Sequence, residues 1–119
     1  RQFPAAGSGE DGALFLDKTL RSGTRIEFAG NVVVLGDVNP GAEIVAEGNV
    51  IIWGRLRGMV HAGSKGNKNA VICALDLSPT QLRIAGEVSA VLKPQENPKP
   101  EIARINKNGK LQAEFWSPG

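Results

Sequence analysis

Apolar residues recur at every sixth position through the first half of the chain. An α-helix would space its apolar residues three and four apart, and a simple hairpin sheet would not keep a strict period of six. The period therefore predicts short strands that are separated by regularly placed corners. The positions are Leu14, Leu20, Ile26, Val32, Val38, Ile44, Val50, Leu56 and Ala62.

A longer repeat of eighteen residues contains three of these periods. The segment GNVVVLG at residues 30–36 recurs as GNVIIWG at residues 48–54. The similar segments 24–30 and 80–86 lie fifty-six residues apart, which fits if one turn carries two extra residues in the polar loop 65–69. Stacked turns of three strands bury a continuous core, so the sequence predicts an all-β, three-sided solenoid of four to five turns. The turns are expected to begin near Gly12, Gly30, Gly48 and Gly66, and a fifth is expected to open at Gly86.

One wall of this solenoid is apolar on its outward side as well. Strand residues alternate in direction, so the inward columns define the outward ones. An apolar patch larger than a few hundred Å² commonly marks an interface. We therefore predict a symmetric homodimer with Trp53 as its anchor; the alternative is that the C-terminal segment folds back over this wall. The predicted interface comprises Val33, Leu35, Ile51, Trp53, Val71 and Cys73, extended by Phe15 and Val91.

A corner beside another wall combines small residues with arginines. Arg21 and Arg57 flank Asn39, and the segments Ser22-Gly23 and Pro40-Gly41 stack with Gly58 at the adjoining bend. Small residues let the backbone of another protein approach, while guanidinium groups pair with its carboxylates. The corner is thus a candidate protein-binding surface, and an ordinary solvated edge is the alternative.

The chain divides into three parts. Residues 1–12 are rich in Gly, Ala and Ser and are expected to form a flexible linker from a further N-terminal domain. The solenoid occupies residues 13–92. Residues 93–119 begin with three prolines, which cannot continue the ladder, and Asn108-Gly109 then joins two strand-like runs. We expect this last part to form a β-hairpin that caps the final turn.

Composition and motifs argue against nucleic-acid binding, catalysis and metal binding. The 14 basic and 12 acidic residues are interspersed and aromatics make up 5%, which does not fit a nucleic-acid-binding stripe. The one cysteine excludes a disulfide within the chain, so a reducing cytosol is expected. No nucleophile–base pair or phosphate loop is present, and His61 is expected to be exposed without a second metal ligand. We therefore expect no enzyme activity, catalytic residue, cofactor or metal.

Three segments carry a resemblance to a known family. Residues 16–24, 41–50 and 53–63 contain, in order, Arg-Ser-Gly, Gly-Ala-Glu and Trp-Gly-Arg-Leu-Arg-Gly. They resemble the C-terminal domain of the bacterial septum-site-determining protein MinC over about residues 14–116. The resemblance implies a right-handed three-sided β-helix that dimerises through an apolar wall and binds the membrane-associated ATPase MinD. The whole family protein opposes assembly of the division protein FtsZ.

The resemblance also assigns residues. Arg21, Ser22 and Gly23 match the family's Arg-Ser-Gly-Gln motif for MinD binding, with Thr24 in the place of Gln. FtsZ would be opposed mainly by an N-terminal domain outside this chain, and the protein would be cytoplasmic and reach the membrane only through MinD. The alternatives are a bactofilin-like scaffold that polymerises end to end and a left-handed hexapeptide acyltransferase. By geometry, the neighbouring MinD-binding candidates are Gly41, Glu43, Arg57 and Gly58.

Overall fold

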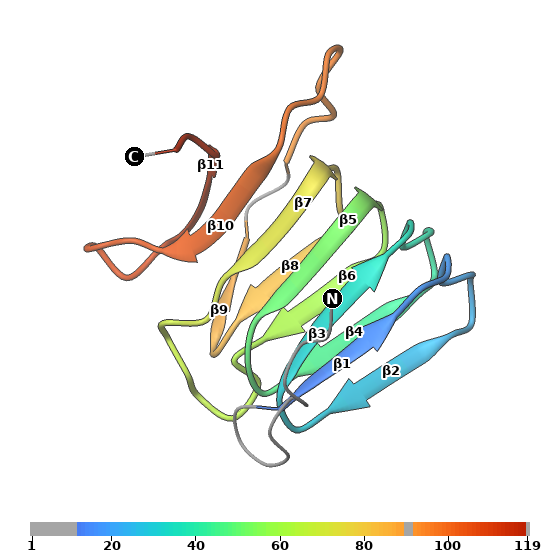
Figure 1. Ribbon diagram of the computed structural model, residues 1–119. Coiled ribbons are helices and arrows are strands. Elements are labelled where there is room, and N and C mark those ends of the chain that lie inside the picture. Colours follow the sequence, from blue (N-terminus) through green and yellow to red (C-terminus); the bar gives the residue numbers. More distant parts are fainter. Residues whose placement is uncertain (1–11, 90–91, 119) are drawn as a thin grey trace.

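The computed structural model describes residues 12–89 and 92–118, which form a parallel β-helix extended by a C-terminal hairpin (Figure 1). The coil is right-handed: front strands run upward to the right while successive turns advance to the upper left. Residues 1–11 of the predicted linker, and Val91, lie outside the described residues. No helix that could span a membrane occurs in the part of the chain that the structure describes. The right-handed course separates this coil from the left-handed hexapeptide acyltransferases.

The strands form two sheets. The coil strands pair in parallel within each sheet and make four turns. Sheet A contains, in spatial order, β1 (Ala13–Leu16), β3 (Asn31–Leu35), β5 (Val50–Leu56), β7 (Ile72–Leu77), β10 (Glu101–Ile105) and β11 (Leu111–Phe115). Sheet B contains β2 (Arg25–Phe28), β4 (Glu43–Ala46), β6 (Met59–Ala62), β8 (Gln81–Ile84) and β9 (Glu87–Val88).

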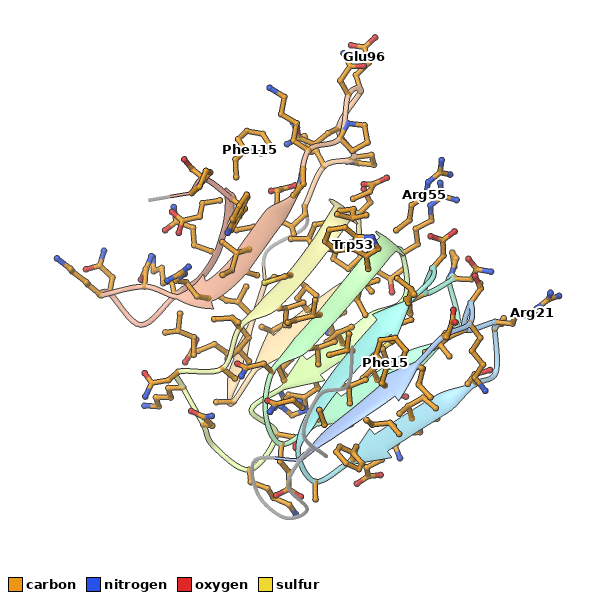
Figure 2. All side chains as sticks on the ribbon, viewed as in Figure 1. Phe15, Arg21, Trp53, Arg55, Glu96 and Phe115 are labelled. Atoms are coloured by element: carbon orange, nitrogen blue, oxygen red, sulfur yellow. The ribbon has the colours of Figure 1, made fainter. Side chains whose placement is uncertain are left out.

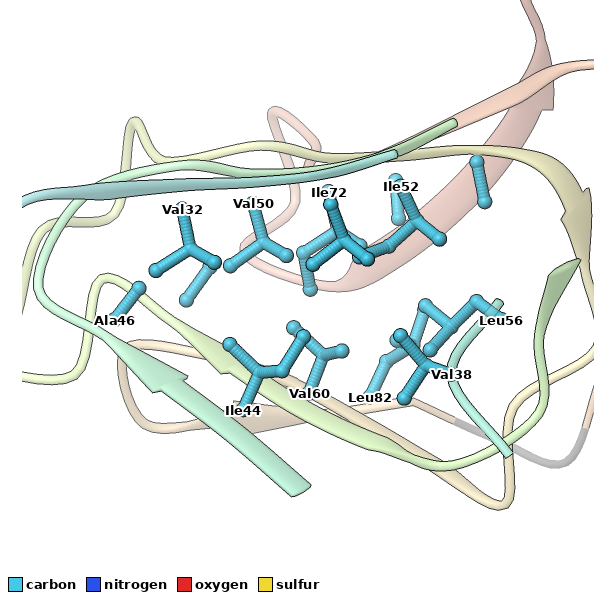
Figure 3. Close-up of a cluster of buried hydrophobic side chains, with 14 of the residues drawn as sticks. Val32, Val38, Ile44, Ala46, Val50, Ile52, Leu56, Val60, Ile72 and Leu82 are labelled. Atoms are coloured by element: carbon cyan, nitrogen blue, oxygen red, sulfur yellow. The ribbon is translucent and has the colours of Figure 1, made fainter. Parts of the chain in front are cut away.

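The third side of the coil is a narrow column. Leu20, Val38 and Leu56 are joined by single parallel bridges, and each is at most 1% exposed. The inward side chains of the two sheets meet this column to form one aliphatic core, with Val32, Val50 and Ile72 facing Ile44, Val60 and Leu82 (Figure 3). The predicted three-sided all-β solenoid is therefore confirmed.

An asparagine ladder stabilises the corner that leads into sheet A. Asn31 Oδ1 accepts hydrogen bonds from the Asn49 backbone N at 2.8 Å and from Asn49 Nδ2 at 3.1 Å. One turn further, Asn49 Oδ1 accepts a bond from the Val71 backbone N at 2.8 Å. The side chains thus satisfy backbone donors at bends where the strand ladder is interrupted.

The repeat length varies more than the sequence suggested. In sheet B, Ile26 pairs with Ile44 and Ile44 with Val60, so the second step is sixteen residues rather than eighteen. Val60 then pairs with Leu82, twenty-two residues on. The prediction of one turn with two extra residues was therefore wrong: one step is shorter by two and the next longer by four. Ala62 is buried and pairs with Ile84, but it is not the equivalent of Ile44, whose partner is Val60.

Gly58 explains the short step. Its backbone N donates to Val38 O at 3.1 Å, so the chain bends directly from β5 into β6. A β-carbon on Gly58 would overlap Ala42 O and lie 2.7 Å from Asn39 O, so a side chain there would be excluded. The longer step comes from the loop between β6 and β7, in which residues 65–69 are exposed.

The coil ends at β8. The predicted fifth turn was wrong, because the chain reverses at Ala85, which has φ +52°, and β9 pairs antiparallel with β8. The C-terminal hairpin then returns to sheet A, where β10 pairs antiparallel with β7. Its inner face packs on the core through Ala103, which is 0% exposed, and through the partly buried Ile105 and Leu111. The hairpin thus covers the last turn, as a solenoid end requires.

Candidate interaction surfaces

Three stacked bends form a ridge along the corner between the third side and sheet B. We call residues 21–24, 39–42 and 57–58 the corner ridge. Gly23 N donates to Gly41 O at 3.0 Å, which joins the first bend to the second. Met59 N donates to Ala42 O at 3.0 Å directly after the third bend. Backbone hydrogen bonds therefore hold the three bends in register from turn to turn.

Two glycines of the corner ridge have backbone conformations that other residues rarely adopt. Gly23 has φ +89° and Gly41 has φ +88°. A β-carbon on Gly41 would also lie 3.0 Å from the Ser22 β-carbon, whereas one on Gly23 would meet no atom within 4 Å. Gly41 is thus required for stacking, whereas a side chain at Gly23 would point into open space.

Two arginines belong to the corner ridge, and a third lies beside it. Arg21 and Arg57 are exposed, and Arg55, which the sequence did not single out for binding, projects from the same edge as Arg21 (Figure 2). Among the described residues, none of these three guanidinium groups makes a salt bridge. They are therefore available to carboxylates of another molecule.

Glu43 differs from the other predicted ridge residues. It lies on β4, where its carboxylate is 3.4 Å from Arg25 Nε. Arg25 also pairs with Glu27 at 2.7 Å. Glu43 is therefore only partly exposed and already has a cationic partner. The structure brings Arg21, Ser22, Gly23, Gly41 and Arg57 together as exposed residues of the corner ridge. It buries Gly58 beneath them and sets Glu43 to the side.

The outer face of sheet A, here called the apolar face, carries the predicted interface residues. Cα register aligns Phe15, Val33, Ile51 and Cys73 across four strands, and Leu35 with Trp53. Trp53 is 61% exposed and Phe15 60%, and both project from this face (Figure 2). Val71 lies immediately before β7 and is partly buried.

The C-terminal hairpin extends the apolar face rather than covering it. Ile102 of β10 is aligned with Cys73, so the apolar row continues by one position onto the hairpin, whereas the neighbouring outward residues Arg104 and Glu114 form an ion pair. The alternative that the C-terminal segment folds back over this wall is therefore wrong for the described residues. Sequence reasoning missed Ile102 and Trp116, because the period of six says nothing about a strand that pairs outside the coil.

A hollow of about 260 Å³ lies where the hairpin meets the coil. Trp53 and Leu75 contribute from the coil side, and Pro100 and Trp116 from the hairpin side. Trp116 is held there because its backbone N donates to Pro100 O at 2.9 Å. The hollow is lined by Ile51, Ile52, Trp53, Cys73, Ala74, Leu75, Pro100, Glu101 and Trp116.

Two titratable groups border this hollow. Burial raises the pKa of the Cys73 thiol, and nearby Arg104 offsets part of that increase. Burial, with the charge of Asp76 as a smaller cause, also raises the pKa of Glu101. A thiol with a raised pKa is less often ionised at neutral pH, so the surroundings of Cys73 suit a small apolar side chain better than a nucleophile.

His61 does not lie where the sequence suggested. The shortened step places it beside Val45, while Met59 takes the position next to Glu43. The ring is partly buried, and Nε2 donates to Ala85 O at 2.8 Å. The expectation of an exposed histidine was therefore wrong, since the imidazole supports the bend that ends the coil. Among the described residues, no three His, Cys, Asp or Glu side chains cluster closely enough to hold a metal ion.

Comparisons with known proteins identify relatives of this chain. Residues 14–116 match the family model for the C-terminal domain of the septum formation inhibitor MinC. The chain is 54% identical over 96 residues to the probable septum site-determining protein MinC of Gloeobacter violaceus, covering 80% of this chain and 34% of that protein. It is 51% identical over 105 residues to the corresponding protein of Clostridium acetobutylicum, covering 87% and 49%. The chain thus spans between about a third and a half of these relatives.

The fold also matches a solved structure. A chain of the MinC:MinD cell division protein complex of Aquifex aeolicus superimposes with a TM-score of 0.82 at 38% identity. The match covers 90% of this chain and 88% of that chain. The β-helix and its hairpin extension are therefore shared with that protein over nearly their full length.

Proposed function

The chain belongs to the family of MinC C-terminal domains, and we propose that it pairs with a second copy of itself and binds the ATPase MinD. Its role is non-catalytic: it brings a septum-site-determining protein to MinD. Opposition to FtsZ assembly would depend mainly on a further domain outside this chain. The protein would act in the cytoplasm and reach the inner face of the membrane through MinD.

The corner ridge carries the MinD proposal. Its bends are stacked through backbone hydrogen bonds, and glycines keep the surface low enough for a partner's backbone to approach. Arg21 and Arg57, in its first and third bends, are exposed and free of salt bridges among the described residues. Fork-shaped guanidinium groups bind carboxylates in a defined geometry. The related chain whose structure is described as a MinC:MinD complex supports the identity of the partner.

The apolar face supports the dimer proposal. Phe15, Ile51 and Trp53 are each between 39% and 61% exposed on one sheet surface. A dimer with two-fold symmetry places the same patch of both copies in contact, which suits a face composed of apolar residues. The corner ridge lies at the edge of the coil and the apolar face on its front (Figure 2), so one chain can hold both partners at once.

Co-sedimentation with lipid vesicles tests this function. The chain is mixed with MinD and vesicles in the presence of ATP or of ADP, and the fraction pelleted with MinD is measured. We expect capture with ATP-bound MinD and much less with ADP. Equal pelleting with vesicles alone would contradict recruitment through MinD. Sedimentation velocity without MinD then measures the dimer separately.

A further inference from the structure

The hollow on the apolar face suits a protein side chain better than a separate ligand. Pockets for small organic ligands commonly measure about 300–1,000 Å³, and this hollow is smaller, at about 260 Å³. Glu101 is the only charged residue that lines it; the others are apolar, aromatic or, in Cys73, a weakly polar thiol. A lone carboxylate cannot orient an anionic or strongly polar ligand. The lining therefore favours an apolar side chain.

The hollow exists because the hairpin lies against the coil. Trp53 and Leu75 form one wall of the hollow, and Pro100 and Trp116 form the other. Ile102 adds a further apolar position in register with Cys73. The C-terminal hairpin thus provides half of a recess on the surface that the proposed dimer would use.

The hairpin adds apolar surface only beside the hollow. On β10 and β11 the side chains that share the outward direction of Ile102 are Arg104, Gln112 and Glu114, and Arg104 Nε lies 3.6 Å from Glu114 Oε1. The apolar part of the hairpin surface is therefore Ile102 together with Trp116, next to the hollow.

We propose that the C-terminal hairpin is part of the dimer interface, and that the hollow between Trp53 and Trp116 receives an apolar side chain from the second copy. This rests on the proposed dimer. A second copy is the fitting occupant because each chain carries on one face both a hollow and exposed apolar side chains, Phe15 and Trp53 among them. Two-fold symmetry then fills both hollows at once.

Tryptophan fluorescence tests the inference directly, because Trp53 and Trp116 are the only two tryptophans in the sequence. In a Trp53→Phe variant, Trp116 is the sole tryptophan. We expect its emission to move to shorter wavelength as the chain is concentrated through the dimerisation range followed by sedimentation velocity. Dimer formation without that shift would overturn the proposal and leave the dimer itself standing.

Matched substitutions in the hairpin provide a second measurement. Trp116→Ala removes one wall of the hollow and should raise the dimer dissociation constant roughly 10- to 100-fold, as for other central tryptophans. Phe115→Ala is the control, because Phe115 is 53% exposed and does not line the hollow. It should change the constant less than about threefold, because Phe115 shares the direction of the inward Ala113 and points away from the side of the hairpin that carries Ile102. Equal effects of the two variants would overturn the proposal, whereas a wild-type chain that stays monomeric would refute the dimer as well.

Discussion

Gly41 lies directly against Ser22 on the corner ridge, so that a β-carbon on Gly41 would overlap the Ser22 hydroxyl. The two residues belong to successive turns, and Gly23 N also donates to Gly41 O at 3.0 Å. The height of the ridge is therefore set by the absence of a side chain at Gly41. Any residue placed there must push the Arg21–Thr24 bend outward.

Gly41→Ala should destabilise the fold. Alanine at φ +88° costs about 1–2 kcal/mol, and the contact with Ser22 adds to this. The expected result is a drop of several degrees in the midpoint of thermal unfolding, followed by circular dichroism. Gly86→Ala is the control: a β-carbon there meets nothing within 4 Å, so its midpoint should stay near that of the wild type. Equal midpoints for the two variants would contradict the stacking argument.

Arg21→Ala should weaken capture by ATP-bound MinD. Loss of a charge-assisted hydrogen bond costs about 1.5–3 kcal/mol, which corresponds to roughly a 10- to 100-fold lower affinity. Arg83→Ala, on an exposed position of sheet B, is the control and should bind as the wild type does. The measurement is a titration of MinD on vesicles. Similar losses for both variants would indicate a general charge effect rather than a ridge contact.

Gly23→Asp should weaken MinD capture more than Gly23→Asn, which carries the same backbone strain at φ +89° without the charge, and both should leave the dimer unchanged. A β-carbon on Gly23 meets no atom of its own chain within 4 Å, so a side chain there projects outward from the ridge, where the partner would approach. The carboxylate would additionally pair with the neighbouring arginines and compete with the partner's acidic groups. Co-sedimentation reports the loss and sedimentation velocity the intact dimer. Undiminished capture would exclude the Gly23 bend from the MinD contact.

Ile51→Asp should convert the dimer into a folded monomer. Ile51 lies on the apolar face and is 39% exposed. A carboxylate at this position stays hydrated in the monomer but loses its water when two copies pair, which disfavours the dimer. Met59→Asp is a close match, since Met59 is 38% exposed on sheet B, outside the apolar face. Sedimentation velocity should give a monomer for the first variant and a dimer for the second. A dimer for Ile51→Asp would place the interface elsewhere.

The sequence pattern predicted the coil, its buried columns and the apolar face, because the period of six follows the strand geometry directly. It failed where corners change length. Val60, rather than Ala62, pairs with Ile44 in the neighbouring strand. The reason is that the bend at Gly58 is two residues shorter than the bend at Pro40-Gly41. The pattern of apolar residues survives such a change, since Val60 and Ala62 both point inward. Corner lengths therefore leave no clear trace in the hydrophobic pattern.

The sequence also did not predict that the hairpin contributes to the apolar face, and the reason is different. Asn108-Gly109 predicts that β10 and β11 pair with each other, but not which outer strand receives β10. That choice depends on Ala103 filling the open end of the core, where it is fully buried. As a result Ile102 and Trp116 joined a surface for which the sequence had offered only coil residues. Tertiary packing, not local propensity, decided their position.

The raised pKa of Glu101 predicts a pH dependence of stability. The folded chain holds the Glu101 proton to higher pH than the unfolded chain, whose glutamate keeps its ordinary value near 4.5. Folding stability from this group is therefore present at low pH and is lost as pH rises through the raised pKa. Glu101→Gln, which stays neutral, should unfold at a higher temperature than the wild type at neutral pH, and the difference should shrink on acidification. Asp76→Asn in both backgrounds provides the control, because Asp76 contributes to the shift and its removal should reduce the difference. A difference between Glu101→Gln and wild type that is the same at every pH would show that the carboxylate charge is not its cause.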